Sequence, residues 1–345
     1  MKTSKALIFF GISAFLLFLL ILAGLKNGAE QRSWAETAYA FFGSGEDADL
    51  EYFIRYLRLP RIVAAFSVGA CLAVCGAVLQ TVLKNALASP FTLGLSQGAA
   101  FGVTFAITLM GAGMIGNTGS GVMISSISAA VLCAFIGSLT AAAVIMGFSF
   151  VRGMTPQGLI LAGVAVSAFF GACTMLLQFF ATDTQVAASL FWTFGDIGKG
   201  GWREALTVLS VTALGTLAVL RYSWDYNAII WGDLYAAGLG VSVKKIRIYT
   251  IIITSVMAAF ATAFYGVIGF VGLIAPHTVR LIFRHTGHVF LITASAVTGG
   301  VFLLGADILA QKAAAPLVLP VGVLTSFAGV PLFLYLLIRR SVKND

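Results

Sequence analysis

Residues 248–283 read IYTIIITSVMAAFATAFYGVIGFVGLIAPHTVRLIF, an apolar run too long for one membrane crossing of about 20 residues. Its second half contains four residues that can interrupt a helix: Gly266, Gly269, Gly272 and Pro276. Proline removes a backbone N–H and glycine adds backbone freedom, so helices kink or end at such residues. We therefore expect two spans here, 248–266 and 268–283, with a break between them.

The composition of the whole chain is typical of membrane-embedded helices. Of its 345 residues, 59% are apolar and only 10% are charged, and the mean hydropathy is +0.99. Soluble domains carry about 25% charged residues. The 21 lysines and arginines are spread thinly between apolar runs and form no basic face. This composition excludes a soluble enzyme, a nucleic-acid-binding protein and a disordered tail.

The predicted fold class is an all-α integral membrane protein, a single transmembrane domain over 1–345 with about ten helices. The ten apolar windows are 6–25, 62–83, 93–115, 121–148, 157–181, 205–220, 248–266, 268–283, 289–309 and 317–338. The first window follows Lys2 and Lys5, as in a signal peptide, but no small-residue cleavage site follows it. We therefore expect a retained first helix.

The basic residues favour cytoplasmic N- and C-termini. With ten spans both termini share a side, and this placement puts 13 of the 21 lysines and arginines inside and the other 8 outside. Cytoplasmic loops carry such an excess. Arg55, Arg58 and Arg61, before the second span, oppose the trend. Lipid phosphate, nearby acids or carboxylates on a partner protein could balance them.

Two segments resemble each other weakly in the placement of glycine and proline. One runs from Gly76 to Thr92 and the other from Ala263 to Thr278. An offset of five spans inverts the two halves in the membrane, an arrangement common in transporters. We therefore expect a weak inverted repeat.

The sequence contains no motif for hydrolysing ATP or a peptide bond. Gly198-Lys199 is followed by glycine and does not complete a Walker A motif, and neither His-Glu-x-x-His nor Gly-x-Ser-x-Gly occurs. We expect no enzyme activity and no cofactor in this chain. Any ATP and Mg²⁺ would be bound by a partner ATPase.

Few polar residues within the spans could bind an ion. Asp307 is the one acid well inside a span, and we favour a pairing with a neighbouring helix over an ion-coupling site. His277, His285 and His288 fit interfacial positions. The four cysteines lie in apolar runs and are interpreted as packing residues: Cys71, Cys75, Cys133 and Cys173. No metal site is expected.

The connection 221–247 is the longest one on the expected cytoplasmic side. It mixes aromatic and aliphatic residues with small polar gaps, and it reads as two short amphipathic helices broken at Gly238 and Gly240. Such a surface suits docking of a soluble partner. An interfacial helix lying on lipid is the alternative.

Several motifs, in order from about residue 55 to the C-terminus, resemble the FecCD/BtuC-type permeases of ABC importers for iron-siderophores, haem and cobalamin. They are Arg58-Leu59-Pro60-Arg61, Gly76 to Gln80, Asn85 to Pro90 with Leu93-Gly94 and Gly98-Ala99, Leu161 to Ala165, Gly266 to His277, Gly305-Ala306-Asp307, and Pro320 to Val323. The Gly-Phe-Val-Gly-Leu-Ile-Ala-Pro-His run, 269–277, is the most specific of them.

This resemblance implies a BtuC-like ten-helix permease in the cytoplasmic (inner) membrane of a prokaryote. It implies a second permease copy, as a homodimer around a central pathway. It also implies two cytoplasmic ATPase subunits and an extracytoplasmic substrate-binding protein. The segment from about 225 to 245, with its centre at Gly232 to Val243, resembles the part that seats in the ATPase. The coupling residues are Gly232, Asp233, Leu234, Tyr235, Ala236, Ala237, Gly238, Leu239, Gly240 and Val241.

The resemblance also assigns residues to docking and to the pathway. Arg58 and Arg61 look like arginines that meet acids on the binding protein. At the position of a further arginine of cobalamin-type permeases this chain has Gln311, and the neighbouring Lys312 could substitute for that arginine. The inner gate falls at Thr155, Pro156 and Gln157. Val186 to Gly195 resembles a short external helix whose Phe191, Trp192 and Phe194 line the pathway or anchor the membrane interface.

The function expected from these residues is import of an iron-siderophore-type metal chelate by alternating access, driven by separate ATPases. Cobalamin and haem remain alternatives, and Gln311 leans away from cobalamin. A secondary transporter with Asp307 in an ion site is a rival from another class. A membrane scaffold without transport is a third.

Overall fold

The computed structural model describes residues 2–26, 33–43, 47–112, 127–150, 155–283, 287–315 and 317–341. These residues are helical with short connections, and apart from isolated bridges such as Phe194–Val267 none of them forms a β-strand. The helices are α1 (Lys2–Lys26), α2 (Trp34–Phe42), α3 (Ala48–Tyr52), the π-helical turn η1 (Phe53–Arg58), α4 (Leu59–Val82), α5 (Leu95–Leu109), α6 (Ile127–Phe150), α7 (Pro156–Phe180), α8 (Asp183–Thr193), the 3-10 turn η2 (Ile197–Lys199), α9 (Trp202–Leu220), α10 (Ser223–Ile229), α11 (Asp233–Gly238), α12 (Val243–Tyr265), α13 (Val271–Ile282), α14 (His288–Lys312) and α15 (Val321–Ser341).

Helices stand at all ten predicted membrane spans, which confirms the predicted fold class. Within the described residues, seven segments are long and apolar enough to cross a bilayer. Three shorter apolar helices occupy the remaining positions: α5, α13 and the part of α15 up to Pro331. The predicted span 93–115 is too long, because α5 ends at Leu109. The first residues of the predicted span 121–148 lie outside the described residues.

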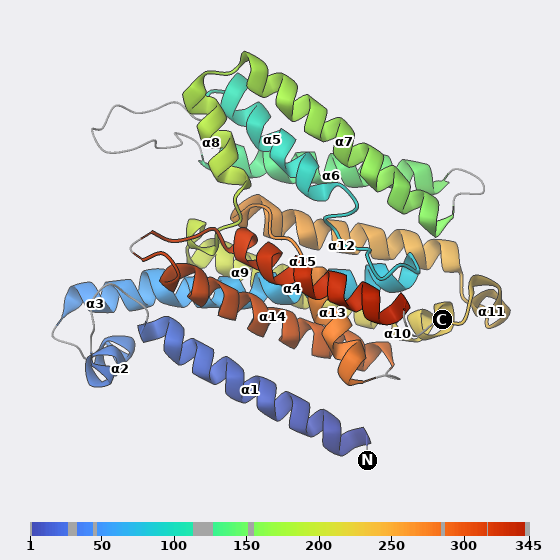
Figure 1. The fold of residues 1–345 in the computed structure, drawn as a ribbon, viewed down its shortest axis with the longest axis horizontal. Coiled ribbons are helices and arrows are strands. Elements are labelled where there is room, and N and C mark those ends of the chain that lie inside the picture. Colours follow the sequence, from blue (N-terminus) through green and yellow to red (C-terminus); the bar gives the residue numbers. More distant parts are fainter. Residues whose placement is uncertain are drawn as a thin grey trace.

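The two ends of this helical bundle can be told apart. The end where α4 begins, called here the Arg61 end, also holds α8, η2 and the last turn of α12. The opposite end, called the Asp233 end, holds α10 and α11. The start of α1 and the end of α15 both lie towards the Asp233 end (Figure 1). Both termini therefore share a side, as an even number of crossings requires.

The apolar run 248–283 is divided into two helices as predicted, but only some of the predicted helix-breaking residues lie in the break. The chain leaves α12 after Tyr265 through Gly266, at φ +76°, and enters α13 after Phe270, at φ +65°. Gly272 and Pro276 lie inside α13 and do not end it. Since Pro276 has no N–H for the Gly272 carbonyl, Gln80 Nε2 of α4 donates to that carbonyl at 3.1 Å.

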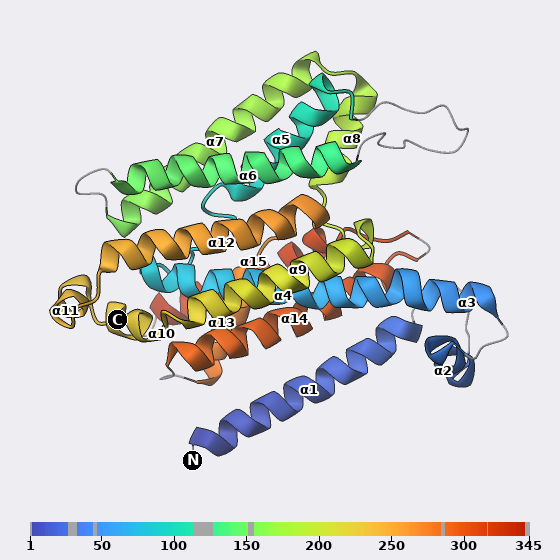
Figure 2. The same cartoon turned by 180° about the vertical axis from the view of Figure 1, so that it is seen from behind.

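Helix α4 forms the centre of the bundle. Twenty of its 24 residues are buried. It lies between α9, α12, α13 and α14 in the two opposite views (Figures 1 and 2). An apolar helix that other helices cover on every side needs no polar stripe, and α4 contains no charged residue after Arg61.

Glycine pairs set the closest helix crossings. A Cβ atom on Gly76 would come within 1.8 Å of the Gly272 carbonyl oxygen, so α4 and α13 touch through their backbones. The α5–α6 crossing is similar, because a Cβ on Gly98 would come within 2.4 Å of the Gly137 oxygen. Small residues permit such close approach between membrane helices. Gly98 and Gly102 of α5 therefore belong to a packing face against α6.

Helix α1 stands outside this bundle. Only 6% of its most apolar stretch is buried within the chain, and it contacts α14 along one side. Phe9 and Phe10 pack there against Phe283 and Phe290, with ring centroids 5.4–6.4 Å apart. The remaining surface of α1 is apolar and exposed, as expected of a helix that faces lipid.

The Gly76–Gly272 contact makes a prediction about stability. Gly76→Ala forces a methyl group into the Gly272 backbone and lowers the free energy of unfolding by about 1–3 kcal/mol or more. Gly147→Ala on α6 is the control, since a Cβ there meets nothing within 4 Å. Thermal unfolding in detergent should show a loss for Gly76→Ala alone. Equal behaviour of both variants would contradict the packing described here.

Candidate functional site

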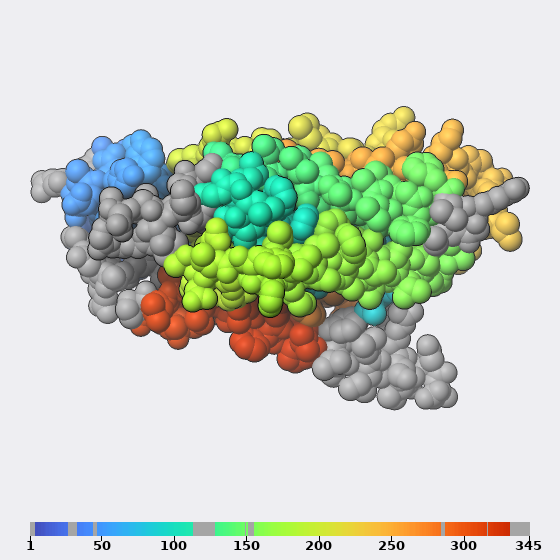
Figure 3. Space-filling model, turned by 90° about the horizontal axis from the view of Figure 1, so that it is seen from above, coloured from blue at the N-terminus to red at the C-terminus, as the bar shows by residue number. Residues whose placement is uncertain are grey.

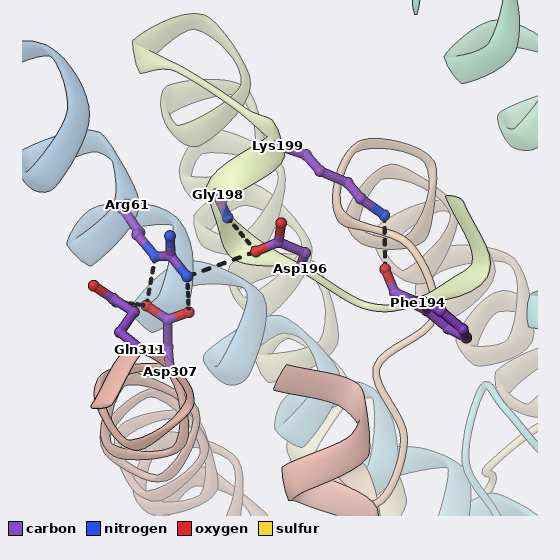
Figure 4. Close-up of polar contacts among 7 residues, drawn as sticks. All are labelled: Arg61, Phe194, Asp196, Gly198, Lys199, Asp307 and Gln311. Atoms are coloured by element: carbon purple, nitrogen blue, oxygen red, sulfur yellow. Dashed lines mark hydrogen bonds and ion pairs between the residues drawn. The ribbon is translucent and has the colours of Figure 1, made fainter. Parts of the chain in front are cut away.

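A buried ion pair joins α4 to α14 at the Arg61 end. Arg61 Nε donates to Asp307 Oδ2 and Arg61 Nη2 to Asp307 Oδ1, both at 2.9 Å, while the Asp307 side chain is 1% exposed. Gln311, one turn further along α14, donates from Nε2 to Asp307 Oδ2 at 2.8 Å (Figure 4). A two-point arginine–carboxylate pair fixes geometry as well as charge. The predicted pairing of Asp307 with a neighbouring helix is confirmed, and both of its oxygens are engaged.

Asp196 connects this pair to the loop after α8. Its Oδ1 lies 3.6 Å from Arg61 Nη2 and accepts a hydrogen bond from the Gly198 N–H at 2.8 Å (Figure 4). Its backbone N–H donates to the Tyr265 carbonyl at 2.9 Å. Arg61 therefore lies where α4, α12, α14 and the η2 loop meet. The sequence analysis did not identify Asp196 as a partner of Arg61. The available signal was an acidic residue two positions before Gly198-Lys199.

The other predicted docking residues lie at the same end. Arg58 is half-buried and donates from Nη1 to the Leu25 carbonyl oxygen at the end of α1. Lys312 is the last residue of α14, one turn after Ile308, and it is exposed. The structure thus brings Arg58, Arg61 and Lys312 to one end of the bundle. Their contact with a binding protein stays a prediction.

A three-membered charge cluster fastens α11 at the opposite end. Asp233 Oδ1 lies 2.7 Å from Lys84 Nζ, and Asp233 Oδ2 lies 3.2 Å from Arg247 Nη2. Arg247 Nε also donates to the Val82 carbonyl at 3.0 Å. Burial acts to raise the pKa of the Asp233 carboxyl, but the two cations outweigh it and hold the pKa below its usual value. Asp233 is therefore ionised at neutral pH and links α11 to α4 and α12.

Beyond this cluster, α11 presents apolar side chains to the outside. Leu234 is 91% exposed, and Trp231, Tyr235 and Leu239 are also exposed, whereas Ala236 is buried against the chain. The two helices expected in this connection are present as α10 and α11, but the break falls at Trp231 and Gly232. Gly232 takes φ +127°, and Gly238 and Gly240 lie at the end of α11.

Helix α10 is fixed to the bundle by His288. The side chain is fully buried, with Nδ1 2.8 Å from Asn227 Oδ1 and Nε2 3.0 Å from Thr81 Oγ1. His288 is the first residue of α14, at the end of a span as expected, but its side chain is buried within the protein because α10 folds back over the start of α14. His285 lies outside the described residues. Among the described residues no group of three histidines, cysteines or acids could hold a metal ion.

The predicted pathway residues lie at opposite ends of α7. Thr155 caps the start of α7 by accepting a hydrogen bond from the Gly158 N–H at 3.1 Å, with Pro156 as the first helical residue and Gln157 exposed. Phe191 and Phe194 of the α8 region are 69% and 42% exposed, but Trp192 is buried. The structure therefore separates the two sets by the length of one membrane-spanning helix.

Lys199 holds the end of α8. Its Nζ donates to the carbonyl oxygens of Phe194 at 2.6 Å (Figure 4), Trp192 at 2.9 Å and Phe191 at 3.3 Å. These carbonyls have no partner within the helix, so a cation beside them is favourable. Burial lowers the pKa of the Lys199 ammonium to about 8, although Asp196 acts in the opposite direction. At neutral pH the ammonium is mostly protonated.

The Arg61–Asp307 pair makes a prediction about coupling between two residues. Arg61→Gln or Asp307→Asn alone leaves one member without its partner and lowers the free energy of unfolding by about 3–5 kcal/mol. The double variant costs less than the sum of the two, which a double-mutant cycle in detergent would measure. Arg55→Gln is the control, because its pair with Glu51 is more exposed and should cost about 0–1 kcal/mol. Additive losses would show that the pair does not act as a unit.

Comparisons with known proteins agree with this geometry. A protein of Methanocaldococcus jannaschii whose name places it among ABC transporter permeases is 44% identical over 98% of this chain and 96% of its own length. The cobalamin import system permease of Halobacterium salinarum is 38% identical over 88% of this chain and 77% of its own length.

A solved structure described as an inward-facing conformation of an ABC transporter of the metal-chelate type has a similar fold. The TM-score is 0.82 at 28% identity, covering 96% of this chain and 99% of that one. The sequence model of the FecCD transport family matches residues 16–339, nearly the whole chain. The chain therefore belongs to the FecCD transport family.

Proposed function

We propose that this chain is the membrane-spanning permease subunit of an ABC importer that moves a metal chelate by alternating access. The observation that carries the proposal is the exposed apolar surface of α11, which the ion pairs of Asp233 with Lys84 and Arg247 hold against the bundle. The sequence contains no Walker A motif, so ATP hydrolysis would need a separate subunit. An exposed apolar tip on a rigid base suits docking of a separate ATPase. Family membership supports the same assignment.

The proposed assembly contains two copies of this chain, two ATPase subunits and a binding protein. The ATPases bind residues 232–241 at the Asp233 end, which we place in the cytoplasm together with both termini. The binding protein docks at the Arg61 end near Arg58 and Lys312. The second copy packs on α7, which runs across the middle of the face seen in Figure 3. Its exposed side chains include Leu161, Val164 and Phe179.

The pathway runs along α7, from Thr155, Pro156 and Gln157 at the cytoplasmic end to Phe191 and Phe194 at the other. Closure of the ATPases moves α11. The ion pairs of Asp233 with Lys84 and Arg247 then transmit this movement to the end of α4 and the start of α12. Small and apolar side chains on α7 would let a bulky chelate pass without trapping it. The chain itself needs no cofactor, since ATP and Mg²⁺ are bound by the ATPases.

The proposed cargo is a ferric siderophore, with cobalamin and haem as alternatives. Cobalamin is supported by the name of the Halobacterium salinarum relative. The siderophore is supported by Gln311, which stands in place of an arginine of the cobalamin type and points its amide at Asp307. Binding-protein docking then depends on other cations at this end.

An ion-coupled secondary transporter is the rival, and the geometry of Asp307 disfavours it. Its two oxygens are engaged by Arg61 and Gln311 and the side chain is 1% exposed, whereas a coupling site must bind and release its ion. A scaffold without transport would leave the exposed tip of α11 without a role.

Docking at α11 is tested by Leu234→Asp. Because Leu234 is 91% exposed, the carboxylate costs the isolated chain little, but it would be buried in the proposed interface. We expect at least a ten-fold loss of ATP-driven uptake in proteoliposomes, with unchanged thermal unfolding of the chain. Arg221→Ala, at an exposed site before the segment 225–245, should leave uptake nearly unchanged. Full uptake by Leu234→Asp would exclude the proposed docking surface.

Cargo is tested by uptake of ferric siderophore, haem and cobalamin into proteoliposomes that hold the complete assembly. We expect ATP-dependent uptake of the ferric siderophore and at least ten-fold slower uptake of cobalamin. Uptake of the same three cargoes is also measured for the Gln311→Arg variant, which restores the arginine of cobalamin-type permeases at the docking end. Preferred uptake of cobalamin by the unchanged chain would replace the proposed cargo, and uptake without ATP would exclude the ABC mechanism.

A further inference from the structure

A cavity of about 740 Å³ lies between α6, α8, α9 and α12 at the Arg61 end. Its size falls in the range of roughly 300–1,000 Å³ of small-molecule sites. It is bounded by α6, α9 and α12, which lie on the near face in Figure 2. Most of its wall is apolar, from Val131, Phe135, Trp192, Phe260 and Phe264.

The depth of the apolar wall matches one leaflet of a bilayer. Phe260 lies five residues before the end of α12, and Phe135 lies eight residues after the start of α6. At 1.5 Å per residue these side chains lie about 8–12 Å from the helix ends. One leaflet contributes about 15 Å of hydrocarbon. The cavity therefore spans the region of acyl chains.

The rim of the cavity carries the charged residues, at the start of α9. Glu204 is occupied by its own helix, because Oε2 accepts a hydrogen bond from the Gly201 N–H at 2.9 Å. Lys199 has used its three donors on the carbonyls of α8, so it can contribute only its charge. Arg203 also lines the cavity and is exposed.

Arg203 differs from the other arginines of this end. Arg55, Arg58 and Arg61 each donate to a carbonyl or a carboxylate of the chain. No described residue accepts a hydrogen bond from the Arg203 side chain or pairs with it. A guanidinium at headgroup depth, above an apolar cavity and beside a second cation, is suited to bind a phosphate group.

We infer that this cavity binds a membrane phospholipid, with an acyl chain between α6 and α12 and the lipid phosphate on Arg203. Lys199 strengthens the positive field at the phosphate. The lipid contacts Trp192 and thereby supports the position of α8. The site is separate from the proposed docking surfaces, although Phe191 of its wall also lies at the end of the proposed pathway.

The test uses fluorescence quenching by phospholipids with brominated acyl chains. The purified chain is reconstituted in phosphatidylcholine vesicles with a variable fraction of brominated phosphatidylglycerol. The signal of Trp192 is taken as the difference from Trp192→Phe, because the chain has five tryptophans. We expect saturable quenching of Trp192 at a low fraction of brominated lipid.

Two variants separate the phosphate contact from general lipid exposure. Arg203→Gln should raise the lipid fraction needed for half-maximal quenching about five-fold. Arg221→Gln, at the other end of α9, is the matched control and should leave that fraction unchanged. No Trp192 quenching, or equal curves for Arg203→Gln and the unchanged chain, would overturn the inference. Relief of quenching by a soluble ferric siderophore or cobalamin would also overturn it, since cargo would then occupy the cavity.

Discussion

The contact between Gly76 and Gly272 is the constraint on which the other parts of the bundle depend. Helix α4 can be surrounded by four helices only if their backbones approach it closely, and a Cβ on Gly76 would lie 1.8 Å from the Gly272 oxygen. Pro276 frees the same Gly272 carbonyl, and Gln80 of α4 satisfies it. The crossing of α4 and α13 is thus held by shape and by a buried hydrogen bond.

Charged residues at both ends of α4 extend this rigid centre to the surfaces. Arg61 near its start binds Asp307 of α14, and the residues just after its end connect through Lys84 to Asp233 of α11. A helix fastened at both ends and packed along its length moves as one body. The surfaces proposed for partners lie outside this body, on α11 and on the exposed side of α7.

Much of the fold could be predicted from sequence because hydropathy and helix breakers act locally. The ten spans and the division after Gly266 follow from apolar length, and the pairing of Asp307 follows from the cost of an unpaired acid. Other features depend on contacts between distant segments. Pro276 stays inside α13 because Gln80 replaces the missing hydrogen bond, and His288 is buried because α10 folds over it. The roles of Asp196 and Lys84 also depend on residues far away in the chain.

The proposed docking of ATPase subunits on α11 is tested most directly by hydrogen–deuterium exchange of the chain with and without those subunits. Bound ATPases should slow exchange at residues 232–241 and leave the centre of α4 unchanged, since α4 is already buried. Unchanged exchange over 232–241 in an assembly that hydrolyses ATP would contradict the role of α11 as the docking surface.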